Sequence, residues 1–268
     1  VREIFSHIDW DCDVKFLFHE KNLGCSFSGK TAWDWVFSQE KEMIFFEDDG
    51  LPSKSFFGFC QELLGKYKYN NQIGYICGIN YGSKFGEATY YFTRYGGGTY
   101  GIATWKRVYN LYEYKLKSYA ETRKLPSFKK NFLYHFEYKY QTRRYERYIK
   151  RGGNTYDLQI GYMYYKHNIY SIMPNINMIT NIGFDMDAAN TKVSPNSKLA
   201  MKYGDMPRYE LDCITHPDKF EIDKEFERQL LFARIFQGKS KARIIYEVYF
   251  SLVARGIKKL IKIFKYMF

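Results

Sequence analysis

The sequence lacks two features that would place it in other protein classes: a long apolar run and paired cysteines. None of its 268 residues lies in an apolar stretch of the about 20 residues that a membrane-spanning helix needs. The five cysteines, Cys12, Cys25, Cys60, Cys77 and Cys213, are scattered, with no Cys-x-x-Cys pair. This pattern argues against a zinc site and a disulfide framework and favours a reducing, cytoplasmic setting. The first residues also show no signal-peptide pattern.

Acidic residues are scarce relative to basic ones. The chain has 41 Lys and Arg against 29 Asp and Glu, a formal net charge of +12. Basic proteins bind phosphate groups, whether of nucleic acid, anionic lipid or nucleotide. A hydrophobic content of 46% is enough for a packed core and argues against global disorder. The 27 Tyr and 23 Phe suit sugar or nucleotide pockets, but we expect most of them in the core.

One short stretch combines a strand pattern with three carboxylates. The apolar run 43–46 ends in Glu47, Asp48 and Asp49, and the chain is then stopped by Gly50-Leu51-Pro52. The run predicts a buried strand, and carboxylates at its end are costly unless a cation neutralises them. Open α/β sheets bind ligands at the carboxyl ends of strands, and hard oxygen ligands suit Mg²⁺ or Mn²⁺ with a diphosphate. The alternative is a solvated acidic turn.

Strand and helix patterns alternate over the first 80 residues. Strands are predicted at 14–19, 43–46 and 72–78, and helices at about 28–39 and 56–66. This alternation predicts a layered α/β sheet. Ser26, Ser28, Gly29 and Lys30 stand at the start of the first helix, where free N–H groups and a Lys would suit a phosphate. An ordinary capped helix with a solvated Lys is the alternative.

The middle of the chain is less regular. Residues 82–101 are rich in Gly and Tyr and predict a long functional loop, and a helical stretch is expected from 103–107 onward. Residues 107–151 are crowded with Tyr, Lys and Arg, as in a nucleic-acid-binding face or in solvated amphipathic helices. A helix is predicted to begin at 154–159, a strand at 171–174, and a polar loop over 177–191.

The last residues predict a basic amphipathic helix. Ile257, Leu260, Ile261 and Phe264 follow the i, i+3, i+4, i+7 spacing, while Lys258, Lys259, Lys262 and Lys265 cover the other face. This composition is typical of a helix that lies on an anionic membrane. The alternative is that the four apolar side chains pack on the body of the protein.

Several blocks, taken in order, resemble one known family. They are Asn22-Leu23-Gly24-Cys25, Phe45 to Pro52, Phe56 to Leu64, Ala103 to Arg107, Tyr156-Asp157-Leu158-Gln159 and Asn181 to Phe184. Together they resemble bacterial nucleotide-sugar glycosyltransferases with the GT-A fold, of the kind found in surface-polysaccharide gene clusters. The resemblance extends to His216-Pro217. It implies a GT-A-like α/β domain over 1–220, with a mixed, mostly parallel central sheet flanked by helices, and a C-terminal helical extension with a basic tail over 221–268.

The resemblance also implies roles for individual residues. The acidic triplet stands for the family's Asp-x-Asp motif, so that Asp49 would bind Mn²⁺ or Mg²⁺ while Glu47 and Asp48 lie near the ribose and the metal. The block 156–159 stands for Trp-Asp-x-Gln with Tyr in place of Trp, and Asp157 takes the place of the catalytic base. Lys30, Asn22 and Gly24 would bind the donor, and Asn80, Trp105, Tyr156 and Gln159 would lie toward the acceptor and its loop.

Two departures from the family put activity in doubt. The family has a late His, a candidate metal or phosphate ligand, where this chain has Asn190, and Asn would do this less well. Family members also begin earlier, with a strand and a helix that hold the nucleotide base. We therefore expect a GT-A-like domain without its first strand and helix, and an exposed sheet edge where that strand belongs.

The expected function is that of a metal-dependent, inverting glycosyltransferase. It would move a sugar from a nucleotide-diphosphate donor to a saccharide or lipid-linked acceptor, at the inner face of the plasma membrane. The rivals are a catalytically inactive sugar-binding relative and a basic nucleic-acid-binding protein, although we expect no nucleic-acid partner. An acidic pocket with a basic tail would favour the enzyme, and a continuous basic groove would favour nucleic acid.

Overall fold

The computed structural model describes residues 8, 10–96, 100–153, 155–183 and 204–250. Within them the strands are β1 (Glu42–Phe45), β2 (Gly50–Pro52), β3 (Ile73–Cys77), β4 (Tyr90–Thr93), β5 (Ile102–Trp105), β6 (Tyr170–Pro174) and β7 (Ile179–Asn181). The helices are α1 (Gly24–Gln39), α2 (Ser55–Lys66), α3 (Lys106–Tyr109), α4 (Tyr119–Thr122), α5 (Pro126–Lys130), α6 (His135–Arg151), α7 (Asp157–His167), α9 (Lys224–Leu230) and α10 (Lys241–Ile245), with π-helical turns η2 (Leu231–Ile235) and η3 (Tyr246–Phe250).

The central sheet has five strands in the order β1-β5-β3-β6-β4. The predicted mixed α/β sheet flanked by helices is confirmed, but its mostly parallel arrangement is wrong, because only β3 and β6 pair in parallel. The segment between β3 and β5 contains β4 but no described helix, and β5 pairs with β3 in the antiparallel sense. A parallel neighbour needs a long crossover, and β3 reaches β6 through the helices α3 to α7.

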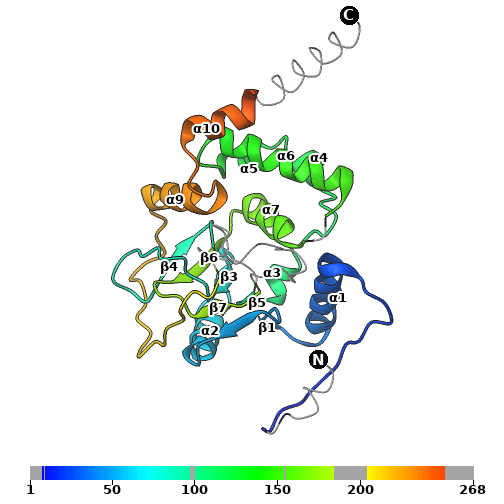
Figure 1. The fold of residues 1–268 in the computed structure, drawn as a ribbon, viewed down its shortest axis with the longest axis vertical. Helices are drawn as coiled ribbons and strands as arrows, with labels where there is room; N and C mark the ends of the chain where they lie inside the picture. The colour runs from blue at the N-terminus through cyan, green and yellow to red at the C-terminus, as the bar shows by residue number, and fades with distance from the viewer. Residues whose placement is uncertain (1–7, 9, 97–99, 154, 184–203, 251–268) are drawn as a thin grey trace, which may run out of the picture.

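Helices cover the sheet on both sides (Figure 1). Helix α2 contacts β1, β3 and β5 and buries Phe56, Phe59 and Leu63 completely. Helix α7 lies on the other side, where Tyr164 packs against Tyr75 of β3 with ring centroids 5.7 Å apart. The helices α4, α5 and α6 form a further layer beyond α7 in Figure 1. The core therefore lies between α2, the sheet and α7.

A second, two-stranded sheet joins β2 to β7 directly after the acidic triplet. Gly50 pairs with Asn181, so segments that are 131 positions apart lie side by side. A Cβ on Gly50 would overlap the carbonyl oxygen of Tyr100, and only glycine fits this approach. The polar loop predicted over 177–191 therefore includes a short strand within its described part.

Several boundaries predicted from sequence are also corrected. No strand forms over 14–19 in the described residues, where Phe16 and Phe18 are exposed. The predicted loop 82–101 contains β4, whose four residues are all buried, because its aromatic and β-branched side chains suit a pleated surface. The helical stretch expected from 103 begins with β5, and α3 starts only at Lys106.

The C-terminal helices pack on α6 and on the edge of the sheet. Phe232 of η2 lies against Phe136 of α6, and Phe226 of α9 stacks on Phe85 at 4.8 Å. Tyr249 of η3 is hydrogen-bonded to His135 Nδ1 at 2.8 Å. Helical structure after residue 220 is thus present as far as residue 250, while the predicted amphipathic helix around 257–264 lies outside the described residues. Within the described part, no helix is long and apolar enough to cross a membrane.

Two buried carboxyl groups, one on α9 and one on α6, connect these helices to the end of β4 and the residues after it. Glu227 of α9 accepts hydrogen bonds from the Thr93 hydroxyl and from the Arg94 N–H, and burial raises the pKa of Glu227 to about 7. Glu137 of α6 accepts from the hydroxyls of Tyr95 at 2.8 Å and Tyr165 at 2.6 Å. Because burying a carboxyl is costly without such donors, the positions of α6 and α9 relative to the sheet depend on these contacts.

Candidate functional site

The acidic triplet forms a tight turn between β1 and β2. The Gly50 N–H donates to the carbonyl of Glu47 at 3.1 Å, which closes the turn. Asp48 points outward and is exposed, whereas Asp49 is half-buried. Asp48 and Asp49 therefore differ in exposure, although the charge of Asp48 still acts on Asp49.

Asp49 is held by the segment that follows β7. The Asn181 side-chain amide donates to Asp49 Oδ2 at 3.0 Å, and the Ile182 N–H donates to the Asp49 carbonyl at 2.9 Å. A Cβ on Gly183 would overlap the Asp49 side chain, so glycine at this position makes the approach possible. The block Asn181-Ile182-Gly183, which sequence reasoning noted without assigning it a role, therefore forms the wall of the acidic turn.

The second oxygen of Asp49, Oδ1, differs from the first in its surroundings. Oδ1 is buried and lacks a hydrogen-bond partner among the described residues. Burial raises the pKa of Asp49, and the nearby charge of Asp48 raises it further, against the lowering effect of the Asn181 hydrogen bond. A buried carboxylate oxygen without a donor is costly, and a bound cation would remove this cost.

Glu47 connects the acidic turn to the start of α7. The Tyr156 hydroxyl donates a hydrogen bond to Glu47 Oε1. The Tyr156 ring packs edge-on against Trp33 and Phe45, with centroids 5.7 and 6.3 Å away, and α1 leaves room for the ring because residue 29 is glycine. Asp157, the predicted base, is the next residue and the first of α7. The fold thus joins two predicted motifs that lie 109 positions apart.

Gln159 lies further along α7 and is fully buried. Its Nε2 donates to the Tyr148 hydroxyl of α6 at 2.6 Å, and its Oε1 is buried without a partner among the described residues. The hydrogen bond to Tyr148 holds α7 against α6. The predicted acceptor role of Gln159 stays a prediction.

The predicted donor-binding residues near α1 have local partners. Helix α1 begins at Gly24, so Lys30 stands in its second turn and not at its amino terminus, where it pairs with Asp34. Asn22 Oδ1 accepts from the Gly24 N–H at 2.7 Å, and Gly24 has a positive φ of 74°. These two residues form the turn that starts the helix, because the left-handed backbone region favours glycine.

Two residues predicted on the acceptor side are parts of the core. Asn80 is buried, and its Nδ2 donates to the Pro174 carbonyl at 2.5 Å. Trp105 is only 2% exposed and donates from Nε1 to the Leu64 carbonyl at 3.2 Å. Their contacts are those of structural residues, and a role at the acceptor stays a prediction. Asn190, the predicted second metal ligand, lies outside the described residues.

The described residues fit a cation that arrives with a ligand, not one held in a protein cage. Among them, no group of three or more His, Cys, Asp or Glu side chains is arranged to hold a metal. Mg²⁺ is commonly held by one or two carboxylates together with substrate phosphates. The buried, donor-free Oδ1 of Asp49 matches this sparse arrangement, with the diphosphate supplying further oxygens.

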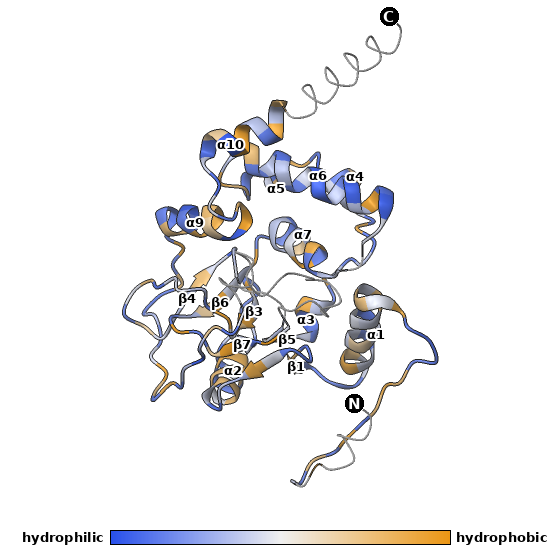
Figure 2. Ribbon diagram, in the orientation of Figure 1, coloured by the Kyte–Doolittle hydropathy of each residue, from blue (hydrophilic) through white to orange (hydrophobic). Residues whose placement is uncertain are grey.

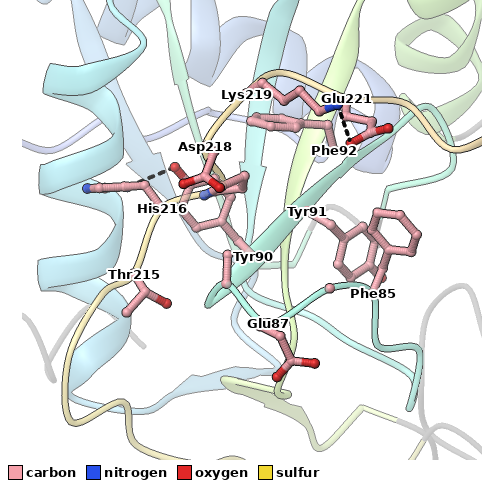
Figure 3. A pocket seen from close by; sticks show the side chains of 13 residues that line it. Phe85, Glu87, Tyr90, Tyr91, Phe92, Thr215, His216, Asp218, Lys219 and Glu221 are labelled. Carbon is pink, nitrogen blue, oxygen red and sulfur yellow. Dashed lines mark hydrogen bonds and ion pairs between the residues drawn. The ribbon is translucent and has the colours of Figure 1, made fainter.

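A separate hollow of about 420 Å³ lies along β4, between residues 85–92 and 215–221 (Figure 3). In it the Tyr90 hydroxyl is hydrogen-bonded to His216 Nδ1 at 2.8 Å, and His216 Nε2 lies 2.9 Å from Glu62. Acidic side chains, those of Glu87, Asp218 and Glu221, line the hollow, and only Lys219 opposes them. Like charge disfavours a nucleotide diphosphate here, and no residue of the acidic triplet lines it. We therefore place the candidate site at the Asp49 turn.

The sequence analysis named His216-Pro217 only as the point to which the resemblance extends. The contact of His216 with Tyr90 depends on β4, which the sequence pattern did not predict, so no signal in the chain connected the two residues. The same applies to Asn181 and Asp49, whose meeting depends on the pairing of β2 with β7.

Comparison with known proteins does not identify the chain. No protein-family model matches it, and no curated protein matches it at a significant level. The functional conclusion therefore depends on the residues and on their geometry.

Proposed function

We propose that this protein is a divalent-cation-dependent glycosyltransferase that moves a sugar from a nucleotide-diphosphate donor to a saccharide or lipid-linked acceptor. The observation that carries the proposal is the hydrogen bond from Tyr156 to Glu47. It brings the segment that contains Asp157 to the acidic turn that contains Asp49. A carboxylate suited to a cation and a carboxylate suited to proton transfer are the two groups that this reaction requires.

Asp49 is the proposed cation ligand, because its Oδ1 is buried and has no donor among the described residues. The cation, when bound, would offset the charge that builds on the leaving diphosphate. Glu47 and Asp48 border the same turn, where they would contact the ribose and the metal. Asn181 and Gly183 position the Asp49 carboxylate, one by a hydrogen bond and the other by leaving room for it.

Asp157 is the proposed general base. It would accept the proton of the acceptor hydroxyl as the hydroxyl oxygen attacks the anomeric carbon, with inversion at that carbon. The Tyr156 ring, packed against Trp33 and Phe45, fixes the start of α7 and thereby the origin of the Asp157 side chain.

The test is a panel of nucleotide-sugars assayed for donor hydrolysis and for calorimetric binding, with and without Mn²⁺. We expect Mn²⁺-dependent binding of at least one donor and slow hydrolysis of that donor. Binding without turnover, also in the presence of candidate acceptors, would identify an inactive sugar-binding relative, for which the Asn190 departure gives a reason. The absence of any Mn²⁺-dependent binding would refute the proposal.

We also propose that the basic tail places the enzyme at an anionic membrane surface, next to a lipid-linked acceptor. The sequence from Lys239 onward carries eight Lys and Arg against one acid, Glu247. Its first part is packed on the fold, because Ile244 and Val248 are buried. The residues proposed to contact lipid are therefore those after residue 250.

A further inference from the structure

The basic charge of the protein is concentrated in the helical layer beyond α7. Residues 115–151 contain twelve Lys and Arg and three acids, a surplus of nine within the net charge of +12 of the whole chain. Of the three acids, Glu137 is buried, while Glu121 and Glu146 pair with Lys124 and Arg123. The other Lys and Arg side chains of this layer therefore have few acidic side chains to neutralise their charge.

Four of these cations form a row along the outer face of α6. Lys139, Arg143, Arg147 and Lys150 follow one another at steps of four, four and three residues, which places them on one side of a helix. The opposite side buries Glu137, Gln141 and Tyr145. Within the described part of the chain, no Asp or Glu pairs with any of the four. Figure 2 shows the hydrophilic colouring of α6 on this layer.

This arrangement is unfavourable for the helix by itself. Like charges at i and i+4 destabilise a helix, and Lys139–Arg143 and Arg143–Arg147 are two such pairs. Attraction to the carboxyl end of the helix dipole accounts for Lys150 in the last turn, but Lys139 and Arg143 lie too far from that end. A polyanionic partner on the outer face would reduce this repulsion.

Exposed apolar side chains occur in the same helical layer and in η3, which contacts α6. Ile149 on α6 and Leu125 at the start of α5 are each 50% exposed, and Tyr246 and Phe250 of η3 are each 55% exposed. Helix α6 contacts η3, and Tyr249 of η3 is bonded to His135. The chain then continues into residues 251–268, which contain five Lys and Arg and no acid. Cations mixed with aliphatic and aromatic side chains are typical of surfaces that lie on anionic lipid.

We propose that the outer face of α6 is a docking surface for an anionic membrane, in addition to the C-terminal tail. The row would contact the phosphate and carboxylate groups of the lipid headgroups, and the exposed apolar side chains would enter the headgroup boundary. At about 1.5 Å per residue, the 17 residues of α6 give a contact about 25 Å long. This proposal does not depend on sugar transfer, because it concerns lipid binding by the whole chain.

The experiment is flotation of the full chain with phosphatidylcholine vesicles and with vesicles of equimolar phosphatidylcholine and phosphatidylserine. The row variant is Lys139→Gln, Arg143→Gln and Arg147→Gln. The matched control is Lys66→Gln, Lys68→Gln and Lys84→Gln, three exposed cations that lie outside the helical layer and whose loss changes the net charge equally. A tail variant replaces Lys258, Lys259, Lys262 and Lys265 with Gln.

We expect the parent chain to bind the vesicles that contain phosphatidylserine and not those of phosphatidylcholine only. Salt should weaken this binding. The row variant should bind at least about tenfold more weakly, because each cation near the surface contributes to the attraction, while the control should bind like the parent chain. The tail variant should keep part of the binding of the parent chain. A variant that carries both the row and the tail substitutions should not bind. Circular dichroism should show that α6 remains folded in every variant.

Three outcomes would overturn the proposal. The first is a row variant that floats like the parent chain while the tail variant does not, which would assign binding to the tail alone. The second is an equal loss in the row variant and the control, which would indicate an effect of net charge. The third is tighter binding to duplex DNA or RNA than to anionic vesicles at the same salt concentration, lost in the row variant, which would make the surface a nucleic-acid interface.

Discussion

Asn181 donates a hydrogen bond to Asp49 Oδ2 at 3.0 Å, while Asp49 Oδ1 is buried without a donor among the described residues. One oxygen is thus fixed by the protein while the other is available to a ligand. We expect Asp49→Asn to keep the shape of the side chain and an acceptor for Asn181, but to remove the charge that a cation needs. The variant should lose Mn²⁺-dependent binding of a nucleotide diphosphate in calorimetry and keep its melting temperature.

The control for this experiment is Asp218→Asn, which removes an exposed carboxylate from the hollow along β4. Binding should be unchanged in this variant. If Asp218→Asn abolished binding and Asp49→Asn did not, the ligand would belong to the hollow and the proposed cation ligand would be wrong.

Gly183 offers a second test of the same carboxylate. Gly183→Ala would place a Cβ against the Asp49 side chain and should displace it, so that nucleotide-diphosphate binding weakens by about tenfold or more, a loss of about 1.4 kcal/mol. The matched substitution is Gly161→Ala in α7, where a Cβ meets nothing within 4 Å. It should stabilise the fold by about 0.5–1 kcal/mol, because glycine is unfavourable inside a helix. Equal binding by the two variants would show that the Asp49 position is not critical.

Asp157→Asn tests the proposed base. It should reduce turnover by about 10²-fold or more and leave the calorimetric binding of the donor intact, because Asn cannot accept the proton of the acceptor. Tyr156→Phe is the companion variant, since it removes the hydrogen bond to Glu47 but keeps the ring. It should weaken donor binding more than it slows turnover of bound donor. Full activity of Asp157→Asn would assign the base to another residue.

The stability of the fold should depend on pH through Glu227. Burial raises the pKa of this carboxyl from 4.5 to about 7, so the folded state favours its protonated form. The stabilisation is fully present below about pH 4.5 and is lost as the pH rises through 7, and it amounts to about 3 kcal/mol. Glu227→Gln should therefore reduce the fall in melting temperature between acidic and alkaline pH, as calorimetry would measure.

Glu225→Gln provides the comparison for Glu227. Glu225 lies in the first turn of the same helix, where it pairs with Arg228 at the surface. This variant should keep the pH dependence of the parent chain. Part of that dependence should persist in Glu227→Gln as well, because burial also raises the pKa of Glu137. A parent chain whose melting temperature is unchanged between acidic and neutral pH would contradict the prediction.

Local patterns predicted those elements whose side chains repeat with a clear period. Helix α2 and strands β1, β3 and β6 were expected within a few residues of their observed bounds, because one apolar face or run defines each of them. Strand β4 was missed because Gly-rich sequence on both sides of Tyr90–Thr93 indicated a loop. The antiparallel return of β5 was missed as well, since chain direction in a sheet depends on connections that no local period encodes.

The candidate site was predictable in its parts but not in its assembly. The sequence patterns identified Asp49 and Tyr156-Asp157 separately. The contact of Tyr156 with Glu47 could not be predicted, because it depends on the packing of α1, β1 and α7 around the Tyr156 ring. For Lys30, in contrast, the role predicted from the sequence is not supported by its position in the fold. Its position near a helix start suggested a phosphate ligand, but α1 begins one turn earlier than predicted and Asp34 pairs with the ammonium group.

The packing of Trp33 against Tyr156 gives the site an intrinsic optical reporter. The indole ring lies 5.7 Å from the ring of Tyr156, whose hydroxyl is bonded to Glu47. The indole N–H is buried without a partner among the described residues. Entry of a divalent cation or a diphosphate at the acidic turn should therefore change the fluorescence of Trp33, and titrations could follow ligand binding without any label.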